Sequence, residues 1–169
     1  MEKDKRLTIK EAPVCLDNRG ESLKSLLCKF FTDLVPQIGA LIDEVTLTVE
    51  PERILPTCKI LKEDPRFGFN YLRCLSVVDY VSRIEIIYHI YSIENLHKMI
   101  VKTSVTEDSP KVPSVTSIWP ASNWFEREGH DLFGVEFIGH PDLSPLLLYE
   151  GFEGYPGKKS FPFHDYDEW

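Results

Sequence analysis

The side chains of this sequence that could perform chemistry are concentrated in residues 119–134. Glu126 and His130 lie four positions apart, so they share one face if the segment is a helix. Arg127 and Asp131 have the same spacing. A face that mixes such charges with large aromatic residues could belong to an active site, to a buried network of ion pairs or to a docking surface.

A metal centre is the first chemical interpretation. The sequence has Glu-x-x-x-His at Glu126 and His130, with His140 and Asp142 further along the chain. The metalloprotease pattern His-Glu-x-x-His instead places two imidazoles on one helix face with a general base beside them. The spacing therefore does not favour a small metalloenzyme, which stays as an alternative that needs Glu126, His130 and His140.

Acid–base catalysis is the second interpretation. Glu128 and Asp131 lie three positions apart and could form a carboxylate pair with one raised pKa. Arg127 stands beside them and favours a neutralised cluster of ion pairs. We therefore expect a structural or interfacial ion-pair cluster, with no catalytic, cofactor-binding or metal-ligating residue in this chain.

Two further motifs fail on their spacing. In residues 151–160 a phosphate-binding loop would need glycine five positions before Gly157, where Phe152 stands, and Pro162 prevents the helix that should follow. The four cysteines, at positions 15, 28, 58 and 74, form no Cys-x-x-Cys pair of the kind that binds zinc or an iron–sulfur cluster. We expect them to be reduced and buried.

Composition and charge limit the function classes. The length of 169 residues and the hydrophobic content of 43% fit one soluble globular domain. The net charge of −8 argues against nucleic-acid binding. Residues 123–169 hold ten acidic, three basic and eleven aromatic residues, which suits a surface that lies against another protein. No apolar run is long enough to cross a membrane, and the N-terminus lacks the apolar core of a secretion signal, so we expect contact with a membrane only through partners.

The elements that must position the charged segment can be read from periodicity. A helix is predicted, with Ser22 as its cap and Pro36 at its end, from the apolar stripe Leu23, Leu26, Leu27, Phe30, Phe31 and Leu34. A strand follows at 45–49 and a short helix at 57–63. Three further strands are predicted at residues 73–80, 84–91 and 98–105, and their short connections require antiparallel pairing.

The predicted fold class is α+β, with about four mostly antiparallel strands, helices packed on one face and an irregular C-terminal extension. Residues 109–113 are expected to be a stiff linker, and a helix then runs from Pro120 to Gly134 before a brief strand at 135–137. Three parts are predicted: a lead-in at 1–20, a globular domain at 21–138 and a partner-binding tail at 139–169.

The charged segment belongs to a longer motif. It reads Glu126-Arg127-Glu128-x-x-Asp131-Leu132-Phe133-Gly134 and continues as Phe137-x-Gly139-His140-Pro141-Asp142-Leu143. This motif resembles the defining motif of the C subunits of the proton-pumping NADH–quinone oxidoreductase (respiratory complex I) and of the J subunits, their plastid and cyanobacterial counterparts. The resemblance extends over roughly residues 67–163 and includes the strand end Val78-Asp79-Tyr80.

The resemblance implies a non-catalytic structural and assembly subunit in the quinone module of the peripheral arm, which supports electron transfer from NADH to quinone coupled to proton translocation. No cofactor is expected on this chain; partner subunits are expected to carry the iron–sulfur clusters and flavin and to form the quinone pocket. The implied location is the cytoplasmic face of a bacterial plasma membrane, or alternatively a thylakoid. The residues expected at partner interfaces are Glu126, Arg127, Glu128, Asp131, Leu132, Phe133, Gly134, Gly139, His140, Pro141, Lys158, Lys159 and Pro162.

The sequence departs from the family pattern at two places. Ser144-Pro145 stands where a basic pair is usual, and Lys158-Lys159 replaces an Arg-Lys pair. Lysine does not reproduce the bidentate fork of arginine. Related subunits of membrane-bound hydrogenases or of ferredoxin- or F420-linked complexes are therefore an alternative.

Overall fold

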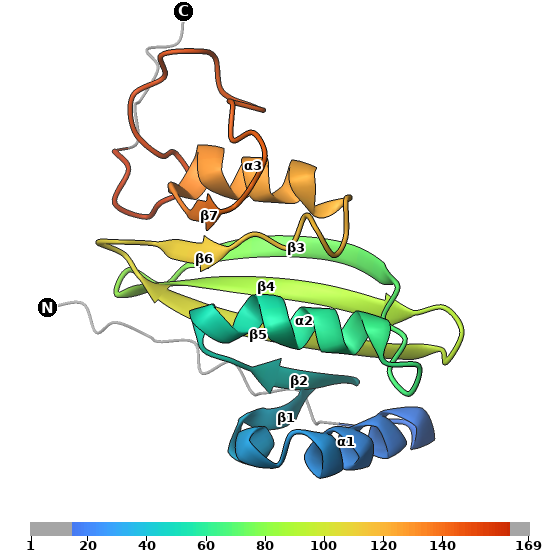
Figure 1. Cartoon of the computed structure of the whole chain (residues 1–169). Coiled ribbons are helices and arrows are strands. Elements are labelled where there is room, and N and C mark those ends of the chain that lie inside the picture. Colours follow the sequence, from blue (N-terminus) through green and yellow to red (C-terminus); the bar gives the residue numbers. More distant parts are fainter. Residues whose placement is uncertain (1–14, 163–169) are drawn as a thin grey trace, which may run out of the picture.

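A five-stranded sheet in the order β1-β2-β5-β4-β3 forms the centre of the fold (Figure 1). The structure is a computed structural model that describes residues 15–162; residues 1–14 of the predicted lead-in and 163–169 of the predicted tail lie outside this range. The strands are β1 (Ile38–Leu41), β2 (Glu44–Thr48), β3 (Tyr71–Asp79), β4 (Arg83–Ser92) and β5 (His97–Thr106). The predicted α+β class and the two antiparallel hairpins β3–β4 and β4–β5 are confirmed.

The sheet differs from the prediction on one side. β1 was not predicted, and β2 pairs with β5 in parallel, with Val45 opposite Met99. The whole segment between β2 and β5 lies in the connection, which is long enough for a parallel return. Local spacing could not reveal this pairing because the two strands are distant in the sequence.

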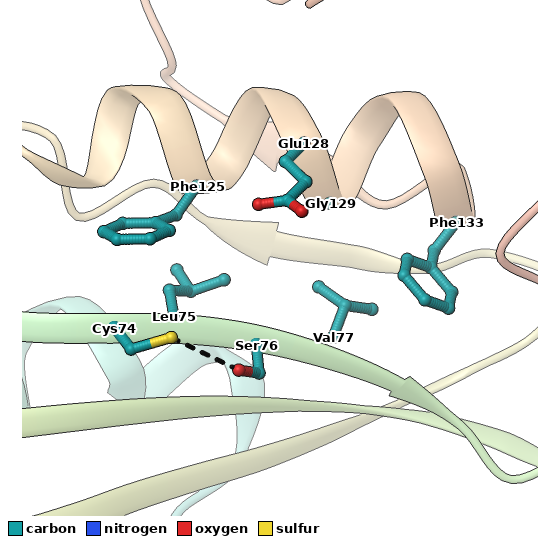
Figure 2. A pocket seen from close by; sticks show the side chains of 8 residues that line it. All are labelled: Cys74, Leu75, Ser76, Val77, Phe125, Glu128, Gly129 and Phe133. Carbon is teal, nitrogen blue, oxygen red and sulfur yellow. Dashed lines mark hydrogen bonds between the residues drawn. The ribbon is translucent and has the colours of Figure 1, made fainter. Parts of the chain in front are cut away.

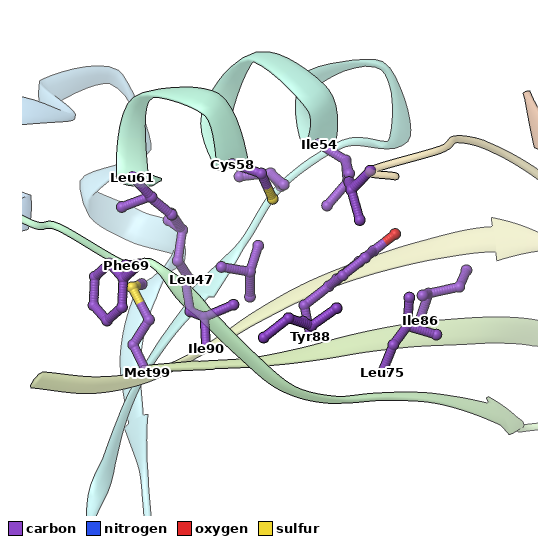
Figure 3. Close-up of a cluster of buried hydrophobic side chains, with 14 of the residues drawn as sticks. Leu47, Ile54, Cys58, Leu61, Phe69, Leu75, Ile86, Tyr88, Ile90 and Met99 are labelled. Atoms are coloured by element: carbon purple, nitrogen blue, oxygen red, sulfur yellow. The ribbon is translucent and has the colours of Figure 1, made fainter. Parts of the chain in front are cut away.

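Two helices share the core with the sheet. They are α1 (Asn18–Phe30), followed by the 3-10 turn η1 (Thr32–Gln37), and α2 (Ile54–Glu63), preceded by η2 (Pro51–Arg53). Figure 3 shows Ile54, Cys58 and Leu61 of α2 above the β4 side chains Ile86, Tyr88 and Ile90. All six are fully buried. The apolar stripe on α1 joins the same cluster through Leu23 and Leu27.

The predicted ends of the first helix are wrong. Asp17, not Ser22, caps α1: its carboxylate accepts a hydrogen bond of 2.7 Å from the Gly20 N–H. Ser22 already lies inside the helix, where its hydroxyl donates to the Asn18 carbonyl. α1 ends at Phe30, and Pro36 lies within η1.

The predicted stiff linker is also wrong. Its residues form strand β6 (Lys111–Pro113), which pairs in parallel with β7 (Glu136–Ile138). Val112 and Phe137 face each other in register and are both buried. The helix α3 (Ser122–Phe133) connects the two strands, so the charged motif lies in a small β-α-β unit beside β3.

The cysteines do not form one class. Cys58 is buried in the core, as predicted, whereas Cys15 is exposed and Cys28 and Cys74 are half-buried. Burial holds the pKa of the Cys58 thiol well above its usual range, with a smaller contribution from the Glu126 carboxylate. Within residues 15–162, no helix has both the length and the apolar character that a bilayer span requires.

Leu61→Ala should destabilise the fold by about 2–5 kcal/mol, because it removes a fully buried side chain and leaves a cavity under α2. Ile60→Ala, at the neighbouring exposed position, is the matched control and should change stability little. Urea unfolding of both variants measures the difference. Equal losses would contradict the assigned packing of α2.

Candidate functional site

Helix α3 begins two residues after Pro120 and ends as predicted at Gly134. Gly134 adopts φ 73°, a left-handed conformation that favours glycine, and its N–H donates to the His130 carbonyl at 2.9 Å. A Cβ at this position would lie 2.7 Å from the Tyr155 ring. The glycine therefore both ends the helix and lets the C-terminal segment (residues 139–162) pack against it.

Gly129 sets the distance between α3 and the main sheet. A Cβ added there would lie 2.8 Å from the Val77 side chain of β3 and 3.3 Å from the Phe137 ring of β7. Both neighbours are stiff or ring side chains, so the close approach depends on the missing Cβ. This contact fixes the orientation of the charged residues on either side of Gly129.

Glu126 faces the interior. It is fully buried, and its Oε1 accepts a hydrogen bond of 2.8 Å from the Val115 N–H. Burial raises the pKa of Glu126, although the Ser114 and Ser122 hydroxyls and the Val115 amide oppose the rise. Glu126 therefore ties α3 to the chain that enters it.

Asp131 faces the C-terminal segment. Its Oδ2 accepts hydrogen bonds from three consecutive main-chain amides, those of Leu146 (3.2 Å), Leu147 (2.8 Å) and Leu148 (2.9 Å). Burial alone would raise the pKa of Asp131, but these three amides together hold it below its usual value. One carboxylate thus fixes a turn of chain that has no regular structure of its own.

Arg127 holds the same segment from the side. Its guanidinium donates to the main-chain oxygens of Ser144 (3.0 Å) and Pro145 (2.9 Å) and to the Ser144 hydroxyl (3.2 Å). The Trp124 ring lies 5.5 Å from the same group. The residues that replace the usual basic pair are therefore direct acceptors for Arg127.

The predicted ion-pair cluster is wrong. Among the described residues, no ion pair joins Arg127 to Glu126, Glu128 or Asp131. Main-chain groups satisfy three of these charges because irregular backbone lies against the helix and needs partners. Glu128 differs from the other three: it is exposed and lines a groove between α3 and β3 (Figure 2).

The candidate metal residues have other partners. Glu126 is bound to Val115, and the His130 Nδ1 lies 2.9 Å from the Val135 carbonyl. His140 accepts through Nδ1 from the Asp142 N–H, and burial lowers the pKa of its imidazole. In the part of the chain that the structure describes, no three His, Cys, Asp or Glu side chains are grouped to hold a metal ion.

The remaining predicted site residues lie along the C-terminal segment. The Gly157 N–H donates to the Leu132 carbonyl at 2.8 Å, and a Cβ on Gly157 would lie 2.9 Å or less from Phe133 ring atoms. Lys158 lies 4.0 Å from Glu107. The predicted residues of this segment that are exposed are Gly139, Pro141, Lys159 and Pro162.

Asp79 is a positioning residue that the sequence reasoning did not single out. It is buried at the end of β3, where Oδ1 accepts from the Val81 N–H at 2.6 Å and Oδ2 from the Lys159 N–H at 2.7 Å. These amides, that of Lys159 first, hold the pKa of Asp79 below its usual value. An acidic residue at the end of a strand, before Tyr80, was the available signal.

Large apolar side chains remain exposed around these contacts. Trp124 on α3 is 63% exposed, and Leu147 and Tyr149 on the C-terminal segment are 59% and 72% exposed. The segment passes over the side of α3 that faces away from the main sheet (Figure 1). Side chains of this type at a surface are typical of a contact with another protein.

These observations define a class: an α+β domain whose charged helix holds an irregular C-terminal segment in place by main-chain hydrogen bonds. Residues 47–167 match the family described as "Respiratory-chain NADH dehydrogenase, 30 Kd subunit". The chain belongs to this family.

Relatives of known name agree with the family. The chain is 40% identical over 141 residues to C subunit 2 of the NADH-quinone oxidoreductase of Rhizobium etli, which covers 82% of this chain and 75% of the relative. It is also 40% identical over 122 residues to the C subunit of the NADH-quinone oxidoreductase of Roseiflexus castenholzii, with 70% of each chain covered.

Two solved structures share the fold. A trypsin-resistant fragment (1-134) of Nqo5 is 30% identical, with a TM-score of 0.55 over 59% of this chain and 83% of the fragment. A chain of the membrane-bound sulfane sulfur reductase, an archaeal respiratory membrane complex, is 25% identical, with a TM-score of 0.71 over 85% of this chain and 86% of that one.

Asp131→Ala should release the C-terminal segment, because three main-chain amides lose a charged acceptor; a hydrogen bond to a charged group is worth about 1.5–3 kcal/mol. Trypsin cleavage after Lys158 and Lys159, followed by mass spectrometry, should become faster while the sheet stays intact. Asp142→Ala, which removes an exposed carboxylate bonded only to Ser144 and near His140, is the control. Equal cleavage of both variants would contradict the role of Asp131.

Glu126→Gln should change the pH dependence of stability. The pKa of Glu126 is raised in the folded chain, so its contribution is fully present below the unfolded pKa of about 4.3 and is lost as pH rises through the folded pKa. Glutamine keeps an acceptor for Val115 and carries no charge. The variant should therefore gain stability relative to wild type as pH rises, in urea unfolding between pH 4 and 8. A difference that does not vary with pH would overturn the assignment; Glu63→Gln, at an exposed position, is the control.

Proposed function

We propose that this chain is a structural and assembly subunit in the peripheral arm of an NADH–quinone oxidoreductase. The observation that carries the proposal is the use of the motif charges. Asp131 and Arg127 bind the main chain of the C-terminal segment and leave Trp124, Leu147 and Tyr149 on the surface. The names of the relatives, which are C subunits of NADH-quinone oxidoreductases, supply the complex.

The chain holds no catalytic residue or redox cofactor in this proposal. The motif carboxylates that could serve a reaction, Glu126 and Asp131, already accept hydrogen bonds from main-chain amides. Iron–sulfur clusters and flavin belong to partner subunits, and the contribution of this chain to electron transfer from NADH to quinone is positional.

The partners are the subunits that form the quinone pocket and carry the terminal iron–sulfur clusters. The exposed aromatic and apolar side chains along α3 and the C-terminal segment support a protein partner. The chain meets the membrane only through the complex, at the cytoplasmic face of a bacterial plasma membrane or at a thylakoid.

A related machine is the second candidate. The sulfane sulfur reductase chain shares the fold over 85% of this chain, so the fold alone does not separate a complex I protein from its relatives. The identity of 40% to the NADH-quinone oxidoreductase sequences, against 25% to the reductase chain, favours the first proposal.

Arg127→Ala tests the proposal in cells that lack the wild-type chain. The variant should lower the amount of assembled complex on native gels, because the segment around Ser144 and Pro145 loses its donor. NADH–quinone oxidoreductase activity per assembled complex should stay unchanged, and residues 20–105 should still fold. The matched control is Arg53→Ala, which removes a surface ion pair with Asp33.

Two outcomes would contradict the proposal. Normal assembly with reduced turnover per complex would give Arg127 a part in the reaction itself. A flavin or iron–sulfur cluster bound to the purified chain, detected by absorbance and metal analysis, would contradict a purely structural role.

A further inference from the structure

The outer edge of β3 has no main-chain partner in residues 15–162. β3 is the last strand of the sheet and pairs only with β4. No other main-chain hydrogen bond of the described chain involves residues 71–79. The outward amide and carbonyl groups of this nine-residue strand are therefore available for pairing.

A groove of about 240 Å³ runs along this edge (Figure 2). Its floor is made by four consecutive residues, Cys74–Val77, whose side chains alternate between the two faces of the sheet. Consecutive residues can line one groove only where the strand's edge itself is open. The opposite wall is one stripe of α3 with Phe125, Gly129 and Phe133.

Natural proteins protect long edge strands with proline, inward charges or bulges. In β3 the bulge lies between Leu72 and Cys74, at the start of the strand, and the only charge near it is Arg73. The sequence Cys-Leu-Ser-Val-Val that follows contains none of these protective features. An open edge of this kind needs a cover in the assembled protein.

Glu128 defines the chemistry of the cover. It is the one ionisable side chain of the groove besides the Cys74 thiol, and it is exposed. Figure 2 shows it between Phe125 and Phe133, below α3. No hydrogen bond or ion pair within residues 15–162 involves its carboxylate, whereas Arg127 and Asp131 are fully engaged. A lysine or arginine opposite Glu128 would complement the groove.

We propose that the groove between α3 and the open edge of β3 receives an extended segment of a partner subunit, which adds a strand to β3 and places a lysine or arginine against Glu128. Main-chain pairing supplies the affinity, and the basic residue fixes the register. This inference rests on the proposed function, since it takes the partner from the same complex.

A second copy of this chain is a poorer occupant. Pairing of β3 with β3 around a two-fold axis would bring two chains of net charge −8 together and would direct both Glu128 carboxylates toward one interface. The charge of the groove therefore favours a different, basic segment.

Amide hydrogen exchange tests the proposal in the full chain, alone and within the purified complex. Exchange in residues 71–79 should slow by about tenfold or more in the complex, because the outward amides gain carbonyl partners. Glu128→Lys should reduce incorporation into the complex, and exchanging the basic residue of the cross-linked partner peptide for glutamate should restore it. Glu63→Lys, an exposed change on α2, is the matched control.

Each outcome decides the matter. If the wild-type chain does not enter the complex, the proposed function fails. If it enters but residues 71–79 exchange as fast as in the free chain, only this inference is overturned. Carbodiimide cross-links from Glu128 to a second copy, or to residues 1–14 or 163–169 of the same chain, would overturn it as well.

Discussion

The hydrogen bonds from three consecutive amides to the Asp131 carboxylate are the interaction on which the C-terminal segment depends. Irregular backbone beside a domain must find partners for its polar groups, and residues 139–162 contain no helix or strand that supplies them. The anion is buried enough for the bonds to be strong, and the amides in turn keep it ionised. Arg127 and Asp79 add two further attachments, one at each side of this point. A segment of low intrinsic order therefore gains a defined course over α3.

The two carboxylates of α3 illustrate how one helix serves two environments. Glu126 faces inward, where burial disfavours its charge, and Asp131 faces the C-terminal segment, where amides favour it. Five positions on a helix turn the side chain by more than a quarter of a turn, so the two groups cannot share one face. Gly129 stands between them and sets α3 against β3. The motif therefore works as a joint: one acid belongs to the domain, the other to the segment that the domain holds.

Local patterns predicted the fold well and the site only in part. Alternation and short turns predicted β3, β4 and β5, and glycine at position 134 predicted the end of α3. The parallel pairs β2–β5 and β6–β7 were missed because each joins residues that are distant in the sequence. The spacing of Arg127 and Asp131 placed both on α3 but could not show that main-chain groups, rather than each other, are their partners. A periodicity argument counts side chains, whereas these charges answer the needs of a backbone that has no periodicity.

The contact between Asp79 and Lys159 spans 80 positions of the sequence, and this separation has a consequence for the order of folding. Closing so long a loop is entropically costly until the sheet that carries Asp79 exists. The β3–β4 hairpin is local and can form early, and its end then offers a preformed acceptor. The C-terminal segment accordingly docks last, onto a finished domain. Slow steps in maturation should thus involve this segment and leave the sheet unaffected, which gives the cell a folded intermediate that is not yet competent to assemble.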